Sequence, residues 1–285
     1  MLKRSALRDK TALVFGACGG IGGAIVRLLD EKGVKLALSD IAEKELKLMA
    51  RDLSQEPLIK TCDITEADEI KALYEYVVSS YGKIDIMINT VGIIYPSLFE
   101  STTYGEISKQ IDVNLLGIIK TIKELIPLMK KQGGGHIVII SSLAGIVPET
   151  YSSIYTATKF ALRGLNLTLN LELKQHNIEV STIFPDSVDT PMLAYEAEHG
   201  GSPLTFLDEP IRPEKVADAV LKAILKKKVE VCVPKGMGRI SKFIMCFPKL
   251  VQRIWPKMEK KGEEGKQKFL ETLAEKNNPK EKAEN

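Results

Sequence analysis

Cysteine, histidine and tryptophan are scarce in this sequence. Its 285 residues include four cysteines, three histidines and one tryptophan. The cysteines, at positions 18, 62, 232 and 246, are widely separated and form no Cys-x-x-Cys pair. This spacing argues against a zinc site and against a disulfide framework, and it suits a reducing cytosol. We therefore expect no bound metal and a cytoplasmic location.

Long apolar runs and a strong net charge are also missing. No stretch approaches the roughly 18 apolar residues of a membrane-spanning helix, and the N-terminus lacks the apolar core of a secretory signal. The formal net charge is only +3, and the first 230 positions hold no basic run interleaved with aromatics, which argues against a nucleic-acid partner. The 44% hydrophobic and 27% charged residues are typical of a soluble globular protein.

Short apolar runs alternate with helical patterns as far as position 234. The strand-like runs are 11–15, 34–39, 58–61, 84–88, 136–140, 178–184 and 229–233, and the helical patterns between them include 43–53, 66–81, 104–130, 155–175 and 213–227. This alternation predicts a single α/β domain over 1–234: a Rossmann-type, doubly wound parallel sheet of about seven strands with helices on both faces. Ligands of such sheets bind beyond the carboxyl ends of the strands.

A glycine-rich turn follows the first strand. Gly16, Gly20 and Gly22 lie between the strand and a helix, where the missing Cβ atoms let backbone amides approach a pyrophosphate. Asp40 ends the second strand, eighteen residues beyond Gly22. A carboxylate there can bind both hydroxyls of an adenosine ribose and would repel a 2′-phosphate, which favours NAD over NADP. Asp40 is also suited to be a helix N-cap, and the two roles are compatible.

Polar residues follow the next two strands. Asp63 could accept a hydrogen bond from an adenine amino group, although a turn residue would look the same. The turn from Asn89 to Gly92 would run beneath a cofactor. Asn114 lies in an otherwise apolar helical stretch, where a buried amide needs a partner, and a local distortion of the helix is one way to supply it.

Tyr155 and Lys159 are four residues apart in a helical pattern and therefore lie on one helix face. Tyrosine has a pKa of about 10, and an ammonium group one turn away favours the phenolate and lowers that pKa. Tyr155 would then be a usable acid and base, with the Ser142 hydroxyl holding a substrate oxygen beside it. Taken alone, the Tyr-x-x-x-Lys spacing also arises by chance on protein surfaces.

Together these motifs resemble the short-chain dehydrogenase/reductase family, in its single-domain branch, over about residues 10–234. The resemblance implies a catalytic tetrad and a cofactor site. The tetrad is Asn114, Ser142, Tyr155 and Lys159; the cofactor-binding residues are Gly16, Gly20, Ile21, Gly22, Asp40, Asp63, Ile64, Asn89, Gly92, Tyr155, Lys159, Pro185, Val188 and Thr190. Three departures from the family pattern are visible: Phe15 replaces a threonine that braces the glycine turn, Asn89-Thr-Val-Gly92 replaces Asn-Asn-Ala-Gly, and Pro185-Asp186 replaces Pro-Gly.

The expected function is NAD-dependent interconversion of a secondary alcohol and a ketone, with Tyr155 as general acid and base. The segment 186–210 reads as a substrate loop whose apolar residues suit a hydrophobic, lipid- or steroid-like substrate, unless they only pack the loop onto the core. Acidic residues in this segment disfavour an anionic substrate. The alternatives are an NADPH-dependent ketone or 3-oxoacyl thioester reductase and a non-catalytic, nucleotide-sensing interaction protein.

A C-terminal extension follows position 234. Apolar residues recur at helical spacing over 235–258, opposite basic ones, and Pro248 and Pro256 are expected to divide the segment into short pieces. It could pack on its own domain, contact a membrane peripherally through 237–257, cap the substrate pocket or bind a second subunit. Residues 259–285 read as a frayed helix or flexible tail. By analogy with the family, we expect a homodimer or homotetramer paired through helices 104–130 and 155–175.

Overall fold

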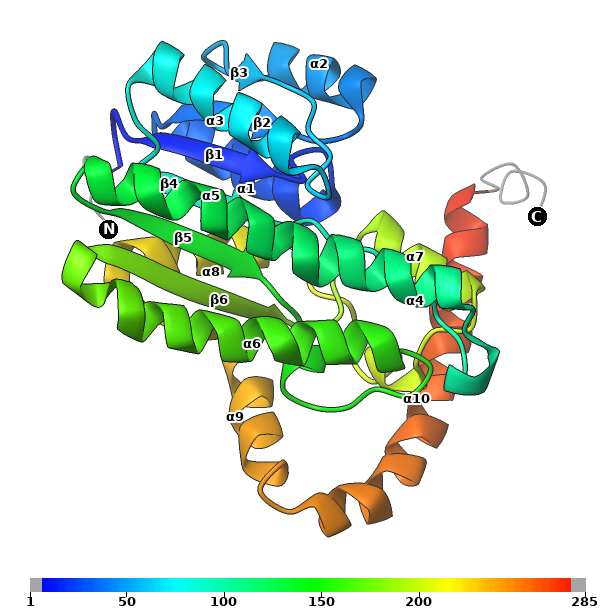
Figure 1. Cartoon of the computed structure of the whole chain (residues 1–285). Helices are drawn as coiled ribbons and strands as arrows, with labels where there is room; N and C mark the ends of the chain where they lie inside the picture. Colours follow the sequence, from blue (N-terminus) through cyan, green and yellow to red (C-terminus); the bar gives the residue numbers. More distant parts are fainter. Residues whose placement is uncertain (1–6, 278–285) are drawn as a thin grey trace.

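The computed structural model describes residues 7–277 and contains a seven-stranded sheet in which every pair of neighbours is parallel (Figure 1). The strand order is β3-β2-β1-β4-β5-β6-β7. The strands are β1 (Thr11–Phe15), β2 (Lys35–Ser39), β3 (Leu58–Ile59), β4 (Ile86–Asn89), β5 (Gly135–Ile140), β6 (Ile178–Pro185) and β7 (Glu230–Val233). The order reverses between β1 and β4, and ligands of such sheets bind beyond the strand ends at this point. The predicted fold class is confirmed.

Helices cover both faces of the sheet and enclose two apolar cores. One core lies against α1 (Gly20–Glu31), α2 (Glu43–Arg51) and α8 (Pro213–Lys226). The other lies against α3 (Ala67–Tyr81), α5 (Ile118–Lys131) and α6 (Ser153–Leu173). The central strands contact both cores, which explains why their sequences are continuous apolar runs and do not alternate.

The helical pattern predicted for 104–130 is one helix path with a distortion in its middle. α4 (Tyr104–Ile111) begins with a capping box between Thr103 and Glu106. A π-helical turn, Asp112–Gly117, then joins it to α5. Asn114 lies in this turn and is fully buried. The local distortion expected around this buried amide is therefore present.

The segment 186–210 is more ordered than the predicted loop. It contains α7 (Pro191–Glu198) and a 3-10 turn, η6 (Pro203–Phe206). Pro191 stands at the first position of α7, where its fixed φ favours a helix and its missing N–H costs nothing. Leu193 and Phe206 are buried against Phe269 of the C-terminal extension, and this partner could not be seen from the segment itself.

The C-terminal extension forms two helices, α9 (Lys235–Ile244) and α10 (Pro248–Asn277). The break expected at Pro256 does not occur, and the charged stretch from Glu259 to Asn277 continues the helix. Tertiary contacts account for this: a Cβ atom added to Gly262 or Gly265 would lie 2.0 Å from a carbonyl oxygen of η6, so the backbone of α10 rests directly on η6. Residues 278–285, the end of the predicted tail, lie outside the described residues.

Three short 3-10 turns complete the described elements: η2 (Phe99–Ser101), η4 (Leu143–Gly145) and η5 (Lys174–His176). No helix between residues 7 and 277 is both long enough and apolar enough to cross a membrane.

Candidate active site

The glycine turn between β1 and α1 needs its glycines for steric reasons. Gly16 has a φ of +72°. A Cβ atom on Gly22 would lie 2.0 Å from the Gly16 carbonyl oxygen, and one on Gly20 would lie 2.6 Å from the Thr190 methyl carbon. The N-cap residue of α1 is Gly19, and no side chain of the described residues caps the helix there. The first turn of α1 holds no acidic residue. The turn therefore presents close backbone and a positive helix end, which fits a pyrophosphate.

Thr90 braces this turn from the neighbouring strand. Its hydroxyl shares its one proton between the carbonyl oxygens of Phe15, at 3.0 Å, and of Gly16, at 2.9 Å. Phe15 itself cannot form the side-chain hydrogen bond of the usual threonine, and its ring packs edge-on against Tyr74 instead. Two of the three departures from the family pattern are thus complementary, because the threonine at position 90 stabilises the turn that Phe15 leaves without a hydroxyl.

Replacing Thr90 with valine should remove both hydrogen bonds at nearly constant volume. We expect a loss of about 1–2 kcal/mol in the free energy of unfolding, since a hydrogen bond contributes roughly 0.5–1.5 kcal/mol. Urea unfolding of the purified variant and of the unmodified protein measures this loss in the free energy of unfolding. Thr90→Ser is the matched control because it keeps the hydroxyl. Equal stability of the valine and serine variants would contradict the bracing role.

Asp40 lies at the end of β2 beside the glycine turn. Its carboxylate accepts hydrogen bonds from the backbone N–H of Cys18, at 3.0 Å, and of Ala42, at 3.3 Å. Ala42, and not Asp40, is the N-cap residue of α2. The carboxylate therefore ties the turn to the start of α2, and its predicted contact with a ribose stays a prediction.

Asp63 and its neighbours form a compact turn after β3. The Asp63 carboxylate accepts hydrogen bonds from the Thr65 backbone N–H, at 2.8 Å, and the Thr65 hydroxyl, at 2.7 Å. Ile64 packs against Gly117 of the π-helical turn, where a Cβ atom would lie 2.8 Å from the isoleucine. Asp63 thus has the bonds expected of a turn residue, and its predicted contact with adenine stays a prediction.

Asn89 and Asn114 fix the backbone that runs beneath the predicted cofactor site. Asn89 is fully buried, accepts from the N–H of Val91 at 3.0 Å and donates to the Thr121 hydroxyl at 3.3 Å. Asn114 bonds both backbone groups of Ile93, accepting from its N–H and donating to its carbonyl, each at 2.8 Å. These bonds supply the partners that the two buried amides require.

Lys159 is a buried lysine between Tyr155 and this backbone. Only 3% of Lys159 is exposed. Its ammonium nitrogen lies 5.2 Å from the centroid of the Tyr155 ring and 3.4 Å from the Ile140 carbonyl oxygen. A Cβ atom on Gly92 would lie 3.4 Å from that nitrogen and 3.7 Å from Asn114 Oδ1. The structure therefore brings together Gly92, Asn114, Tyr155 and Lys159.

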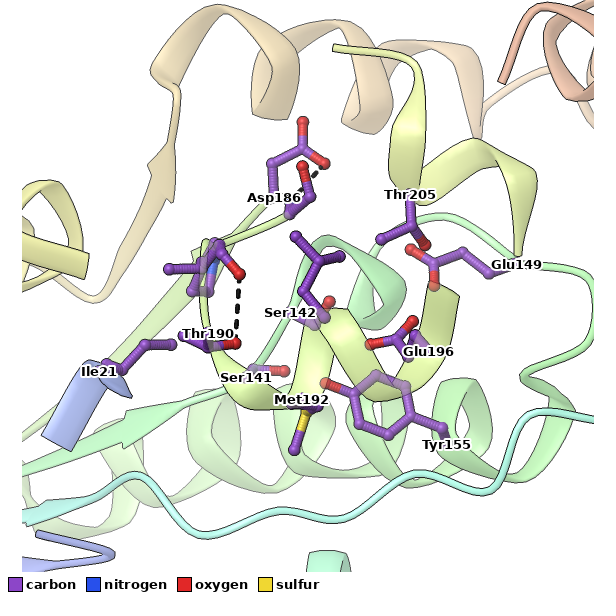
Figure 2. A pocket seen from close by; sticks show the side chains of 14 residues that line it. Ile21, Ser141, Ser142, Glu149, Tyr155, Asp186, Thr190, Met192, Glu196 and Thr205 are labelled. Atoms are coloured by element: carbon purple, nitrogen blue, oxygen red, sulfur yellow. Dashed lines mark hydrogen bonds between the residues drawn. The ribbon is translucent and has the colours of Figure 1, made fainter. Parts of the chain in front are cut away.

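Ser142 and Tyr155 face the same cavity (Figure 2). Ser142 follows β5 and accepts a hydrogen bond from the Ala144 N–H at 3.0 Å, which fixes its hydroxyl. Tyr155 extends from the first turns of α6, and its hydroxyl lies near that of Ser142. All four predicted tetrad residues lie at the carboxyl end of the sheet. The cavity also touches the predicted cofactor residues Ile21, Pro185, Val188 and Thr190.

The pKa of Tyr155 differs from the sequence-based expectation. Burial raises it well above the usual value, and the nearby carboxyl groups of Glu196 and Glu149 raise it further, against a smaller lowering by the hydrogen bond with Ser142. Burial also lowers the pKa of Lys159 to about 8, so its ammonium group stays mostly protonated at neutral pH. The shift of the Tyr155 pKa is opposite in direction to the expected lowering, and Tyr155 is protonated at neutral pH.

Three carboxyl groups line the cavity, two from the predicted substrate segment and one, that of Glu149, that sequence reasoning did not place in the site. They belong to Glu149, Asp186 and Glu196. Burial raises the pKa of Glu149 and of Glu196 to about 8 and that of Asp186 to about 6. Figure 2 shows the carboxyl groups of Glu149 and Glu196 near the Tyr155 ring. Glu149 lies between Ser142 and Tyr155 in the sequence, and this position was the one available signal.

The remainder of the cavity is formed by the substrate segment and its support. Met192 and Leu193 of α7 and Thr205 of η6 contribute to the lining, and the cavity measures about 90 Å³. The Thr190 hydroxyl donates to the Val188 carbonyl at 3.2 Å, which shapes the turn into α7. In residues 7–277, no group of His, Cys, Asp and Glu side chains could hold a metal ion.

Comparison with known proteins identifies the class to which this fold and this site belong. The short chain dehydrogenase family matches residues 10–200. An uncharacterised oxidoreductase of Staphylococcus aureus (strain MW2) is 34% identical over 221 residues, covering 77% of this chain and 93% of the relative. One from Staphylococcus haemolyticus is 29% identical over 219 residues, covering 76% and 92%. The chain belongs to the short-chain dehydrogenase/reductase family, and it is an oxidoreductase of that family.

Two solved structures have the same fold. A short-chain dehydrogenase/reductase from Burkholderia phymatum in complex with NAD has a TM-score of 0.78 at 20% identity, covering 86% of this chain and 95% of the other. A levodione reductase has a TM-score of 0.74 at 24% identity, covering 82% and 99%. At these identities the likeness shows the fold alone.

Proposed function

We propose that the protein catalyses hydride transfer between a secondary alcohol or ketone and NAD, with Tyr155 as general acid and base. The observation that carries this proposal is that Ser142 and Tyr155 line one cavity, with the Lys159 ammonium beside the Tyr155 ring and Asn114 behind Lys159. The glycine turn and the free N-terminus of α1 fit a dinucleotide. A nicotinamide, when bound, accepts or returns the hydride.

Each side chain of the proposed tetrad has its own role in the reaction. Ser142, held by the Ala144 N–H, orients the substrate oxygen beside the Tyr155 hydroxyl. Tyr155 donates its proton to a ketone oxygen or takes the proton of an alcohol. Its raised pKa keeps it protonated, so ketone reduction starts from the abundant form. Lys159 stabilises the phenolate as the proton leaves, and Asn114 fixes the backbone beside Lys159.

We propose NAD over NADP because a carboxylate, Asp40, lies beside the glycine turn and would repel a 2′-phosphate. Fluorescence titration with NADH and NADPH tests this, and we expect NADH to bind at least about tenfold more tightly, a difference of about 1.4 kcal/mol. Asp40→Asn should reduce the preference while it keeps an acceptor oxygen for Cys18. Glu45→Gln, which removes a charge from α2, should change nothing. Preference for NADPH in the unmodified protein would favour the reductase alternative.

For the substrate, we propose an uncharged alcohol or ketone with an apolar body. Ile21, Val188, Met192 and Leu193 support the apolar part. The Asp186 carboxylate, which a pKa of about 6 leaves charged at neutral pH, disfavours an anionic substrate. The cavity of about 90 Å³ is smaller than the roughly 300–1,000 Å³ of typical ligand sites. We therefore assign to it the reacting end of a lipid- or steroid-like molecule.

The proposal includes a homodimer or homotetramer paired through α4, α5 and α6. Large apolar side chains on these helices and the turn between them are exposed, namely Tyr104, Leu116, Leu167 and Leu171. Such residues are commonly covered at interfaces between subunits.

A further inference from the structure

The C-terminal extension presents an apolar ridge that its own domain does not cover. Ile240, Phe243, Phe247 and Leu250 are exposed to 61%, 69%, 48% and 45%. Ile240 and Phe243 lie three residues apart in α9, and Phe247 and Leu250 follow in the connection to α10 and in its first turn. The rings of Phe243 and Phe247 lie with their centroids 5.4 Å apart, which joins the apolar surface across this connection. Figure 1 shows α9 and the first turns of α10 projecting away from the sheet and its covering helices.

The opposite side of α9 packs against the rest of the domain. Gly238 and Ser241 are buried there, and a Cβ atom on Gly238 would lie 2.2 Å from Cys232 of β7. Lys242 forms an ion pair with Glu230, which also pairs with Arg163 at 2.7 Å. Because α9 already has this contact face, the ridge is a second, free apolar face, and it is not the face that packs on the domain.

The charge of the first part of the extension, residues 235–257, is of one sign. Six lysines and arginines and no acidic residue lie between positions 235 and 257. A basic segment with exposed phenylalanines on a helix is the composition that binds the interface of anionic membranes. The same charge opposes the association of two copies through this face, because it would bring two basic surfaces together.

A basic cavity lies next to the ridge, at the root of α9. It measures about 290 Å³ and is lined by α8, β7 and α9. Its cations are Lys222, Lys228, Lys235, Arg239 and Lys242. Among the described residues, only Lys242 of these five forms an ion pair. Glu230 also lines the cavity and pairs with Lys242 and with Arg163, so the excess positive charge lies on the other four cations. Lys235 lies close enough to Lys222 to lower its pKa, so like charges meet here.

We propose that the ridge and the basic cavity form one docking surface for an anionic phospholipid membrane: Phe243 and Phe247 insert among the acyl chains, and the cavity binds a lipid phosphate headgroup. The two parts share α9, in which Arg239 and Lys242 of the cavity alternate with Ile240 and Phe243 of the ridge. The proposal concerns a surface apart from the active site and does not depend on the proposed function.

Docking through this surface would bring the active site to the membrane. The indole N–H of Trp255, in α10, donates to the Pro148 carbonyl at 3.1 Å, and Glu259 accepts a hydrogen bond from Thr150 at 2.7 Å. Glu149 of the cavity beside Tyr155 lies between these two contacts. The helix that carries the end of the ridge is thus fastened to the wall of the active site.

Co-sedimentation of the full chain with phosphatidylcholine vesicles, with and without phosphatidylserine, tests the proposal. We expect binding only to the vesicles that contain phosphatidylserine, and a decrease between about 0.1 M and 1 M salt, where the Debye length falls from about 10 to 3 Å. Phe243→Glu should weaken binding at least about tenfold. Leu48→Glu, at an exposed apolar position of α2, is the matched control and should bind normally.

A second pair of variants separates the cavity from the ridge. Lys222→Gln/Lys235→Gln should weaken binding to phosphatidylserine vesicles at least about fivefold, since each basic residue near the membrane contributes about 1 kcal/mol. Lys130→Gln/Lys131→Gln removes the same charge from the end of α5 and should leave binding to these vesicles unchanged. Binding of inorganic phosphate without any binding to vesicles would overturn the proposal in favour of a soluble anion. The proposal would also be overturned if the unmodified protein were an oligomer that does not bind vesicles and Phe243→Glu made it monomeric. The ridge would then be a subunit interface.

Discussion

Turnover is expected to fall about 10²–10⁴-fold when Tyr155 is replaced by phenylalanine, with the affinity for NADH unchanged. The substitution removes one hydroxyl and keeps the ring, which is the part that lies beside the Lys159 ammonium at 5.2 Å. The residual rate reflects positioning of the substrate by the rest of the site. The measurement is the change in NADH absorbance with a set of secondary alcohols and ketones, together with an NADH binding titration on the same protein.

Tyr151→Phe provides the control for this experiment. Tyr151 stands four residues earlier, is exposed, and contributes a backbone carbonyl to Ser97, which the substitution keeps. Its phenylalanine variant should turn over normally. Normal turnover by Tyr155→Phe would refute the assignment of the acid and base. Loss of both turnover and NADH binding in Tyr155→Phe would instead indicate damage to the fold.

The second large effect is expected at Gly22. A methyl group there would lie 2.0 Å from the Gly16 carbonyl oxygen, and both partners are backbone, so neither can rotate away. Overpacking of this kind costs about 1–3 kcal/mol, which for a domain of this size lowers the melting temperature by roughly 3–10 °C. Displacement of the turn should also weaken NADH binding at least about tenfold. Thermal unfolding with and without NADH measures both effects.

Gly236→Ala is the matched substitution, because an added Cβ atom on this glycine of α9 would have no neighbour within 4 Å. Alanine favours a helix over glycine by about 0.5–1 kcal/mol, so this variant should be as stable as the unmodified protein or slightly more stable. Gly22→Ala could instead have the melting temperature and the NADH affinity of the unmodified protein. That result would show that the turn does not need a glycine at position 22.

The sequence was sufficient for the sheet and for the position of the tetrad because both depend on local patterns. Continuous apolar runs identify the strands, and their carboxyl ends bring Ser142 and the backbone near Asn89 together without knowledge of distant contacts. The distortion at Asn114 was also predictable, since a buried amide in a helix requires a partner. The partner itself, Ile93, depends on how the turn after β4 folds back.

Properties that depend on contacts between distant segments were not predictable. The continuation of α10 through Pro256 rests on its contact with η6, and the order of α7 rests on Phe269. The pKa of Tyr155 was predicted in the wrong direction because spacing reveals the nearby lysine, whereas burial and the carboxyl groups of Glu149 and Glu196 depend on the folded chain. Thr90 was recognised as a departure from the family pattern. Its hydrogen bonds to the glycine turn could not be predicted without knowing how β1 and β4 pair.

The contact of α10 with η6 has a consequence for how substrate range is transferred between relatives. The family match ends at residue 200, whereas η6, Thr205 and the whole of α10 follow it. The proposed catalytic residues thus lie in the part of the chain that the family model matches, whereas Thr205 of the cavity lining and the helix that supports η6 lie beyond it. A substrate profile established for a relative without α10 leaves out the support that α10 gives to this part of the cavity.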